Sequence, residues 1–230
     1  MNFIKYCKNC VIPETRPNTE IGSDGFCSAC KYFWNRENTD WELRKKELLK
    51  IVDKYKNKSN NYYDCIVPSS GGKDSTYQVL KVKELGLNPL VLTITTDMLT
   101  PIGRKNIENL KNKGVDYIEY TINPIVRRKI NKFTLETVGD LTWSEEVAVS
   151  CSVVRLAMKM DIKLIIWGEN SENENGGPEK NSDFFNEIIQ RHDGDWFEEF
   201  GGTNGLRSSD LLSLWSNEGI TELDLLPYTF

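Results

Sequence analysis

The sequence predicts an α/β protein with a parallel sheet, preceded by a small cysteine-rich module. Apolar, β-branched runs alternate with amphipathic stretches between residues 64 and 167, which is typical of a parallel sheet with helices on both faces. A glycine-rich turn follows the first run, and two Cys-x-x-Cys pairs precede it. We therefore divide the chain into a cysteine module, a linking helix, an α/β domain and an acidic segment, at 1–33, 34–61, 62–170 and 171–230.

The cysteine module contains Cys7 and Cys10, then Cys27 and Cys30, with 16 residues between the pairs. This spacing is typical of a zinc ribbon, in which two pairs of thiolates complete a tetrahedron. A segment this short has no core of its own, so Zn²⁺ would supply its folding free energy. Four reduced, unligated cysteines are the alternative. Disulfides are disfavoured because Met1–Cys10 has no signal-peptide core.

A helix is expected at 40–57, with Asp40 as its cap and Trp41, Leu48, Val52 and Tyr55 on one face. We interpret it as a solvated helix between two modules. Further strands are expected at 64–69, 90–96, 115–122 and 162–167, and further helices at 74–85, 100–114, 123–138, 142–160, 183–190 and 209–216.

Start and stop signals mark several of these helices. Thr100 and Pro101 supply a cap and a first-turn proline. Thr142 and Glu145 form a capping box that would begin the helix at 142–160. The last residues, 226–230, are expected to form an apolar end without a helix or strand.

The residues 69–75 read Ser-Ser-Gly-Gly-Lys-Asp-Ser and lie between a predicted strand and a predicted helix. Glycines allow a positive φ and close approach of a ligand, and the free N–H groups of a helix N-terminus bind anions. Phosphate or pyrophosphate is the expected ligand, and a plain glycine-rich turn is the alternative. A Walker loop is excluded, because Val67 stands where it needs glycine and Asp74 where it needs Ser or Thr.

Other candidate residues follow from the expected topology. Ligands of parallel sheets bind beyond the carboxyl ends of the strands, at the point where the strand order reverses. That places Asp97, Glu169 and Asn170 around the same crevice as the loop. The polar segment 171–182 is either a disordered connection or a lid over bound substrate.

Composition narrows the class further. Hydrophobic residues make up 39% of the chain, so a sizeable core is possible, and no run is apolar enough to span a membrane. Residues 171–230 carry 3 basic and 13 acidic side chains, whereas residues 1–63 carry 12 and 8. A long nucleic acid is therefore an unexpected partner. A soluble cytoplasmic protein is the expectation.

The loop resembles the Ser-Gly-Gly-x-Asp-Ser signature of the PP-loop ATP pyrophosphatases, whose fold is adenine nucleotide alpha hydrolase-like. Residues 6–17, 167–170 and 187–196 further resemble the N-acetyl sugar amidotransferases of bacterial surface-polysaccharide (lipopolysaccharide) synthesis. The resemblance covers essentially the whole chain. It implies an enzyme that uses ATP, Mg²⁺ and ammonia to convert an N-acetyl sugar, free or nucleotide-linked, into an acetamidino sugar. Family members continue past the end of this sequence, so a truncated form is expected.

The resemblance also implies roles for individual residues. Asp74 would position Mg²⁺, Asp97 would lie near AMP, and Glu169 and Asn170 would face the acyl-adenylate. Arg155 is either a phosphate ligand or a surface arginine. The residues assigned to catalysis are Lys73, Asp74 and Glu169, and the cofactor-binding residues are Ser69, Ser70, Gly71, Gly72, Lys73, Asp74, Ser75, Asp97, Arg155 and Asn170.

Two cysteines and one histidine remain. Cys65 is expected in the core, and Cys151 is either packing or a reactive thiol. Because His192 is the single histidine, a Cys-His pair that releases ammonia from glutamine is not expected. A separate glutaminase subunit would supply ammonia.

Two other functions fit the same residues. One is a PP-loop enzyme that modifies tRNA, which the acidic final segment disfavours. The other is a non-catalytic scaffold that binds nucleotide and docks a glutaminase partner through the ribbon.

Overall fold

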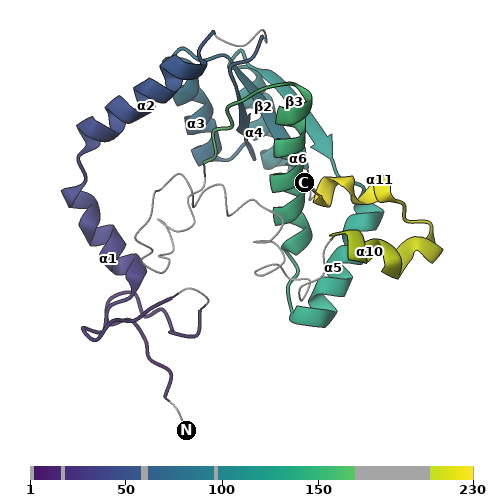
Figure 1. Cartoon of the computed structure of the whole chain (residues 1–230), viewed down its shortest axis with the longest axis horizontal. Coiled ribbons are helices and arrows are strands. Elements are labelled where there is room, and N and C mark those ends of the chain that lie inside the picture. Colours follow the sequence, from purple (N-terminus) through teal and green to yellow (C-terminus); the bar gives the residue numbers. More distant parts are fainter. Residues whose placement is uncertain (1–2, 17–18, 58–61, 96–97, 169–207, 230) are drawn as a thin grey trace. The chain divides into compact units, whose positions relative to one another are not determined.

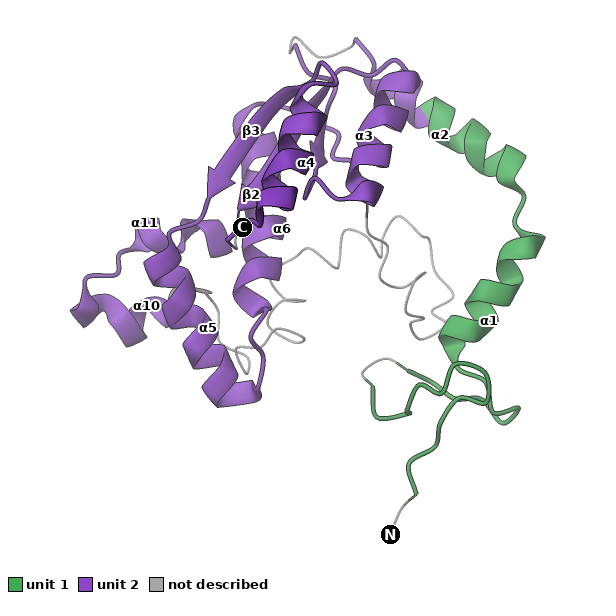
Figure 2. Cartoon of the chain, turned by 180° about the vertical axis from the view of Figure 1, so that it is seen from behind, with its two compact units in different colours: residues 1–50, 169–182 green, residues 51–168, 183–230 purple. Residues whose placement is uncertain are grey.

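A computed structural model describes residues 3–16, 19–57, 62–95, 98–168 and 208–229 (Figure 1). The chain divides into two compact units, coloured separately in Figure 2. The first unit extends to Lys50 and the second begins at Ile51, so the boundary lies inside helix α2, Trp41–Tyr55. No helix within the described ranges is both long and apolar enough to cross a membrane.

The first unit is built around its cysteines. Two antiparallel bridges, Tyr6 with Pro13 and Ile21 with Cys27, hold its loops. Helix α1, Ser28–Asn35, begins directly after Cys27, and the short helix η1, Arg36–Asn38, follows it. The sequence analysis missed α1. The Cys27 sulfur caps this helix by accepting from the Cys30 N–H, so a cysteine takes the place of the usual Ser, Thr, Asp or Asn signal.

Helix α2 confirms the predicted helix and its cap, because Asp40 Oδ1 accepts from the Leu43 N–H at 2.9 Å. The predicted apolar face is only partly correct. Val52 is buried, whereas Trp41 and Leu48 are exposed. Val52 packs with the sheet core of the second unit, so burial begins only in the last turns of the helix.

The second unit contains the expected parallel sheet, with the order β1-β2-β3; β2 and β3 are labelled in Figure 1. The strands are β1 Cys65–Pro68, β2 Pro89–Thr95 and β3 Asp116–Thr121. Both pairs are parallel, with Val67 opposite Val91 and Leu92 opposite Ile118. Helices α3, Lys73–Glu84, and α4, Pro101–Lys111, connect them. The α/β prediction is confirmed.

Successive side chains of each strand point to opposite faces of the sheet, and each face is covered by different helices. Val67 and Val91 pack with Val79 of α3 and Leu110 of α4. Residues Ile66, Leu90 and Leu92 face the other side and pack with Val153 and Ala157 of helix α6, Trp143–Lys159. Each such aliphatic side chain contributes about 1.5–3 kcal/mol by leaving water. The sheet therefore has helices on both faces.

The prediction of a strand at 162–167 is wrong, because this segment pairs with β1 at one position without forming a strand. Only one parallel bridge, between Ile66 and Ile165, joins this segment to β1. Ile66 donates its N–H to Leu164 O and accepts from the Ile166 N–H, both at 2.9 Å. The segment lies on the side of β1 opposite β2, so the order of neighbours reverses at β1.

The predicted capping box at Thr142 is also wrong. Thr142 has φ −109° and ψ −9° and makes no side-chain cap bond, although an N-cap needs extended backbone. Asp140 acts instead, because its Oδ1 accepts from the N–H groups of Thr142 and Trp143 at 2.7 and 3.2 Å. Glu145 accepts from Arg127 Nη1 at 2.6 Å, which ties α6 to helix α5, Pro124–Val138.

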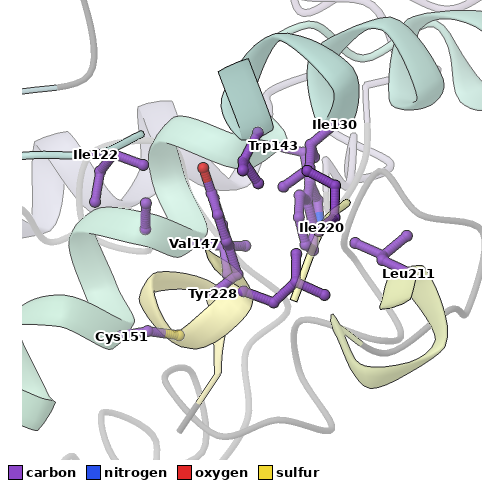
Figure 3. Close-up of a cluster of buried hydrophobic side chains, with 11 residues drawn as sticks. Ile122, Ile130, Trp143, Val147, Cys151, Leu211, Ile220 and Tyr228 are labelled. Atoms are coloured by element: carbon purple, nitrogen blue, oxygen red, sulfur yellow. The ribbon is translucent and has the colours of Figure 1, made fainter. Parts of the chain in front are cut away.

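The end of the chain packs against α5 and α6 (Figure 3). Helix α10, Ser208–Trp215, confirms one predicted helix, whereas the one predicted at 183–190 lies outside the described residues. The elements that follow are η2 Ser216–Glu218, α11 Glu222–Leu225 and η3 Leu226–Tyr228. The prediction of an end without helix was therefore wrong. Tyr228 is buried and stacks on Trp143, with ring centroids 6.3 Å apart.

Candidate functional site

Hydrogen bonds from and to its own serine hydroxyls hold the loop between β1 and α3. Ser69 is anchored to β2, since its N–H donates to Leu92 O at 2.9 Å. Ser69 Oγ accepts from the Gly71 N–H at 3.1 Å and donates to Ser75 Oγ at 3.0 Å. Ser70 Oγ accepts from the Gly72 N–H at 3.3 Å. The N–H groups of both glycines are therefore already bonded to serine hydroxyls. A phosphate can accept from these N–H groups only if it displaces the hydroxyls.

Gly71 is required for two separate reasons. Its φ is +76°, a backbone conformation that residues with a Cβ rarely adopt. A Cβ at this position would also lie 3.0 Å from Ile107 Cγ1 and 3.4 Å from the Ile107 backbone nitrogen. Gly71 thus lets the loop turn directly against α4.

The first turn of α3 presents free donors. The Thr76 N–H donates to Gly72 O at 3.0 Å, whereas the N–H groups of Lys73, Asp74 and Ser75 meet no acceptor among the described residues. These three donors and the positive end of the helix dipole together suit an anion. The predicted loop residues are therefore brought together at a turn that offers several donors to an anion.

Lys73 and Asp74 pair with each other at the entrance to this turn. Lys73 Nζ lies 2.7 and 2.8 Å from the two carboxylate oxygens of Asp74, and both side chains are largely exposed. Exposed ion pairs contribute little to stability, so the pair separates at low cost. Lys73 can then contact a phosphate, and the carboxylate of Asp74 suits Mg²⁺, which prefers hard oxygen ligands.

Two hydroxyl groups in the sheet hold the start of the loop. Thr93 Oγ1 donates to Ser69 O, and Tyr117 OH donates to Thr93 Oγ1. Burial raises the pKa of Tyr117, so its hydroxyl keeps its proton. This chain of hydrogen bonds crosses from β3 through β2 to the loop. Neither residue was predicted from the sequence, although Thr93 interrupts the aliphatic run at 90–94.

Replacing Thr93 with valine keeps the shape of the side chain and removes both hydrogen bonds. We expect Thr93→Val to lower the free energy of unfolding by about 1–3 kcal/mol, because the Ser69 carbonyl loses its donor and the Tyr117 hydroxyl loses its acceptor. Chemical denaturation measures this change. Thr121→Val, at an exposed position of β3, is the control and should cost much less. Equal stability of the two variants would contradict the role of Thr93.

Apart from the loop and the cysteines, Arg155 is the predicted site residue that the structure describes. Asp97, Glu169 and Asn170 lie outside the described residues. Arg155 is half-buried on α6, and its charge opposes the rise in the pKa of the Cys151 thiol. Within the described part of the chain, no hydrogen bond or ion pair connects Arg155 to another group.

Cys65 and Cys151 are buried core residues. Burial raises the pKa of each thiol to about 12. The expectation that Cys65 is core is confirmed, and the packing interpretation of Cys151 is supported over the reactive one.

The four remaining cysteines form the predicted cluster. Their sulfur atoms all lie within 4.8 Å of one another. The Cys7 and Cys30 sulfurs are 3.8 Å apart, and those of Cys10 and Cys27 are 3.5 Å apart. Four sulfurs about 2.3 Å from one tetrahedral zinc lie about 3.8 Å from each other. The donor set and its geometry therefore fit Zn²⁺.

N–H groups point at these sulfurs and favour the thiolate form that zinc binds. Burial alone would raise the pKa of Cys7, but backbone donors, including Cys27 at 3.3 Å and Asn9 at 3.4 Å, lower it to about 6. Burial raises the pKa of Cys27 to about 12 and that of Cys30 as well. The Asn9 side chain also donates to Cys30 Sγ at 3.3 Å. The sequence analysis missed Asn9, which contacts one cysteine of each pair.

Comparisons with known proteins found only distant similarity. No protein-family model and no curated protein sequence matches the chain. One similar solved structure is an NH3-dependent NAD synthetase from Campylobacter jejuni in complex with nitrate, which is 14% identical; the match covers 81% of this chain and 91% of that chain, with a TM-score of 0.43. A second is an NMN synthetase from Francisella tularensis, which is 10% identical; the match covers 82% of this chain and 76% of that chain, with a TM-score of 0.42. A third is a predicted subunit of tRNA methyltransferase from Methanocaldococcus jannaschii, which is 13% identical; the match covers 70% of this chain and 90% of that chain, with a TM-score of 0.36. At these values none of the three assigns a family or a function to this chain.

Proposed function

We propose that this chain is an ATP-dependent amidotransferase of the ATP pyrophosphatase type. It adenylates the N-acetyl group of a sugar and replaces the amide oxygen with ammonia, forming an acetamidino sugar for a bacterial surface glycan. The observation that carries the proposal is the loop of residues 69–75 at the start of α3, where three free N–H groups, a lysine and a carboxylate occur together.

The position of this loop supports a nucleotide ligand. The loop leaves the carboxyl end of β1, and the neighbours of β1 are β2 on one side and the segment around Ile165 on the other. Ligands of open parallel sheets bind at such a reversal of strand order. Asp74 in place of a Walker Ser or Thr favours cleavage between the α and β phosphates.

The proposed reaction has two steps. The amide oxygen attacks the α-phosphorus of ATP, and pyrophosphate leaves. Ammonia then adds to the imidate carbon, and AMP leaves with the former amide oxygen. The net change converts amide, ammonia and ATP to amidine, AMP and pyrophosphate.

The residues of the loop act on the first step. Donors aimed at the β and γ phosphates stabilise the charge that develops as pyrophosphate leaves. We assign this role to the α3 N–H groups, Lys73 and the serine hydroxyls, and assign Mg²⁺ to Asp74. Asp97 would contact AMP, Glu169 and Asn170 the acyl-adenylate, and Arg155 a phosphate.

The remaining assignments concern partners and organisation. A separate glutaminase subunit would supply ammonia to a cytoplasmic enzyme. The ribbon at 1–33 would be structural, since a closed four-cysteine zinc site has no open position for catalysis. The domain at 62–170 would bind ATP, and the acidic region at 171–230 would contact the sugar or a partner.

Product analysis tests the proposal. The protein is incubated with ATP, Mg²⁺ and ammonia across candidate N-acetyl sugars, and the products are identified by mass spectrometry. We expect AMP, pyrophosphate and a sugar in which NH replaces the acetamide oxygen. ADP with inorganic phosphate would contradict the assignment, as would AMP formation with every sugar left unchanged.

Lys73→Ala should remove the charged contact to the phosphates. The expected loss in affinity or rate is about 1.5–3 kcal/mol, the range for a hydrogen bond to a charged group. Lys132→Ala, at an exposed position of α5, is the control and should retain wild-type kinetics. Wild-type kinetics for Lys73→Ala would remove this residue from the site.

A further inference from the structure

The segment beside β1 loses its pairing at Pro68. Ile66 forms both of its ladder hydrogen bonds, to Leu164 O and from the Ile166 N–H. In a parallel ladder the bonds are evenly spaced, so the next one would run from the N–H of residue 68 to Ile166 O. Proline has no N–H. The Ile166 carbonyl therefore needs another donor.

Gln78 provides that donor. Gln78 Nε2, on α3, donates to Ile166 O at 2.9 Å and joins residues 88 positions apart in the sequence. The side-chain amide thus occupies the place in the ladder that Pro68 leaves open. The helix that begins at the phosphate loop consequently also holds the end of the segment around Ile165.

The same side chain explains Gly168. The φ of Gly168 is not in the left-handed region, so its backbone conformation does not require glycine. A Cβ there would lie 2.9 Å from Gln78 Oε1 and 3.5 Å from Gln78 Cδ. A side chain at position 168 would therefore have to displace the Gln78 amide, which packs directly against the backbone at this point.

Gln78 is retained at a cost. Its Oε1 is buried and meets no donor within the described residues, and a buried acceptor without a partner costs about 1–3 kcal/mol. An apolar residue would avoid this cost but would leave Ile166 O without its donor. The arrangement favours backbone position over maximal stability.

We propose that Gln78 is a positioning residue that fixes the backbone from Ile166 to Gly168 beside the phosphate loop. Its part in catalysis rests on the proposed function, because this backbone lies beside the carboxyl end of β1, where the phosphate loop begins. Gln78 contacts no reacting atom in this scheme and acts through the backbone from Ile166 to Gly168.

The test compares Gln78→Ala, Gly168→Ala and the double variant in the full chain. Gln78→Met is added because it keeps the length of the side chain, and Gly103→Ala, a glycine without a left-handed φ on α4, is the control. Amide hydrogen exchange at Ile166 reports the backbone. ATP kinetics with the sugar substrate report catalysis.

We expect Gln78→Ala and Gln78→Met to speed exchange at Ile166 by about tenfold, the equivalent of one lost hydrogen bond. In both, kcat should fall while KM for ATP stays near the wild-type value, since the phosphate loop is unchanged. Gly168→Ala should speed exchange and lower kcat in the wild-type background. It should cause no further change in the Gln78→Ala background, because the added Cβ then has room.

Two results would overturn the proposal. One is unchanged exchange at Ile166 in both Gln78 variants. The other is an equal cost of Gly168→Ala in the two backgrounds, because independent residues give additive effects. Exchange decides the role of Gln78 even if no variant and no wild-type protein cleaves ATP, a result that would count against the proposed function alone.

Discussion

Chelation of zinc is expected to unfold residues 3–30 while the α/β unit stays folded. The core of this module consists of Cys7, Cys27 and Cys30 with only Ile12, Ile21, Phe26 and Ala29 packed against them. So few apolar side chains cannot offset the entropy of ordering the loops. Binding of a structural zinc contributes about 10–16 kcal/mol of folding free energy in small zinc modules. Loss of this free energy is larger than the total stability of the module, so the module unfolds without zinc.

Elemental analysis and NMR measure this effect together. Protein purified under reducing, chelator-free conditions should contain about one zinc, as one four-cysteine site holds a single ion. Amide signals of the module should collapse with chelator and return when zinc is added back. Absence of zinc, or native amide signals in chelator, would show that the cysteines are not metal ligands.

Gly71→Ala is expected to abolish most ATP cleavage. Left-handed backbone costs about 1–2 kcal/mol for a residue with a Cβ, and the added methyl group would press on Ile107. The loop must move to relieve that contact, and displacement of a site by about 1 Å can reduce a rate by about 10²-fold. A loss of this size in kcat/KM, measured by pyrophosphate release, is the expected result.

Gly139→Ala separates strain from close approach. Gly139 has φ +77°, but a Cβ there would meet nothing within 4 Å, and it lies at the end of α5. Both alanine variants should lose the stability that left-handed strain costs, and Gly71→Ala somewhat more, but only Gly71→Ala should lose activity. Ile107→Ala in the Gly71→Ala background should restore part of the rate. Equal activity of the two glycine variants would disprove the role of Gly71 in the site.

Local signals in the sequence predicted much of the fold. The side chain of Thr100 caps its helix as expected, and Gly86 and Gly114 adopt the positive φ values that end the preceding helices. These features depend on neighbouring residues, which the sequence displays directly. The capping box failed because Asp140, only two residues before Thr142, accepts from both the hydroxyl of Thr142 and its N–H, which Glu145 would accept in a capping box.

Contacts between distant residues account for what the sequence did not reveal. The loop at 69–75 was recognised from its composition, but its support by Thr93 and Tyr117 depends on the alignment of three strands. The fourth strand failed because a single proline ends the ladder and a glutamine on another element replaces it. Neither effect has a local pattern, since each joins residues far apart in the chain.

The burial of two thiols confines the oxidation of cysteine to one end of the chain. With pKa values of about 12, Cys65 and Cys151 are ionised at neutral pH to a fraction of about 10⁻⁵. Peroxides convert thiolates to sulfenic acids and react little with buried thiols. Cys10, in contrast, is exposed. Oxidants therefore attack the cysteine module first, and the sheet that carries the phosphate loop keeps its thiols intact.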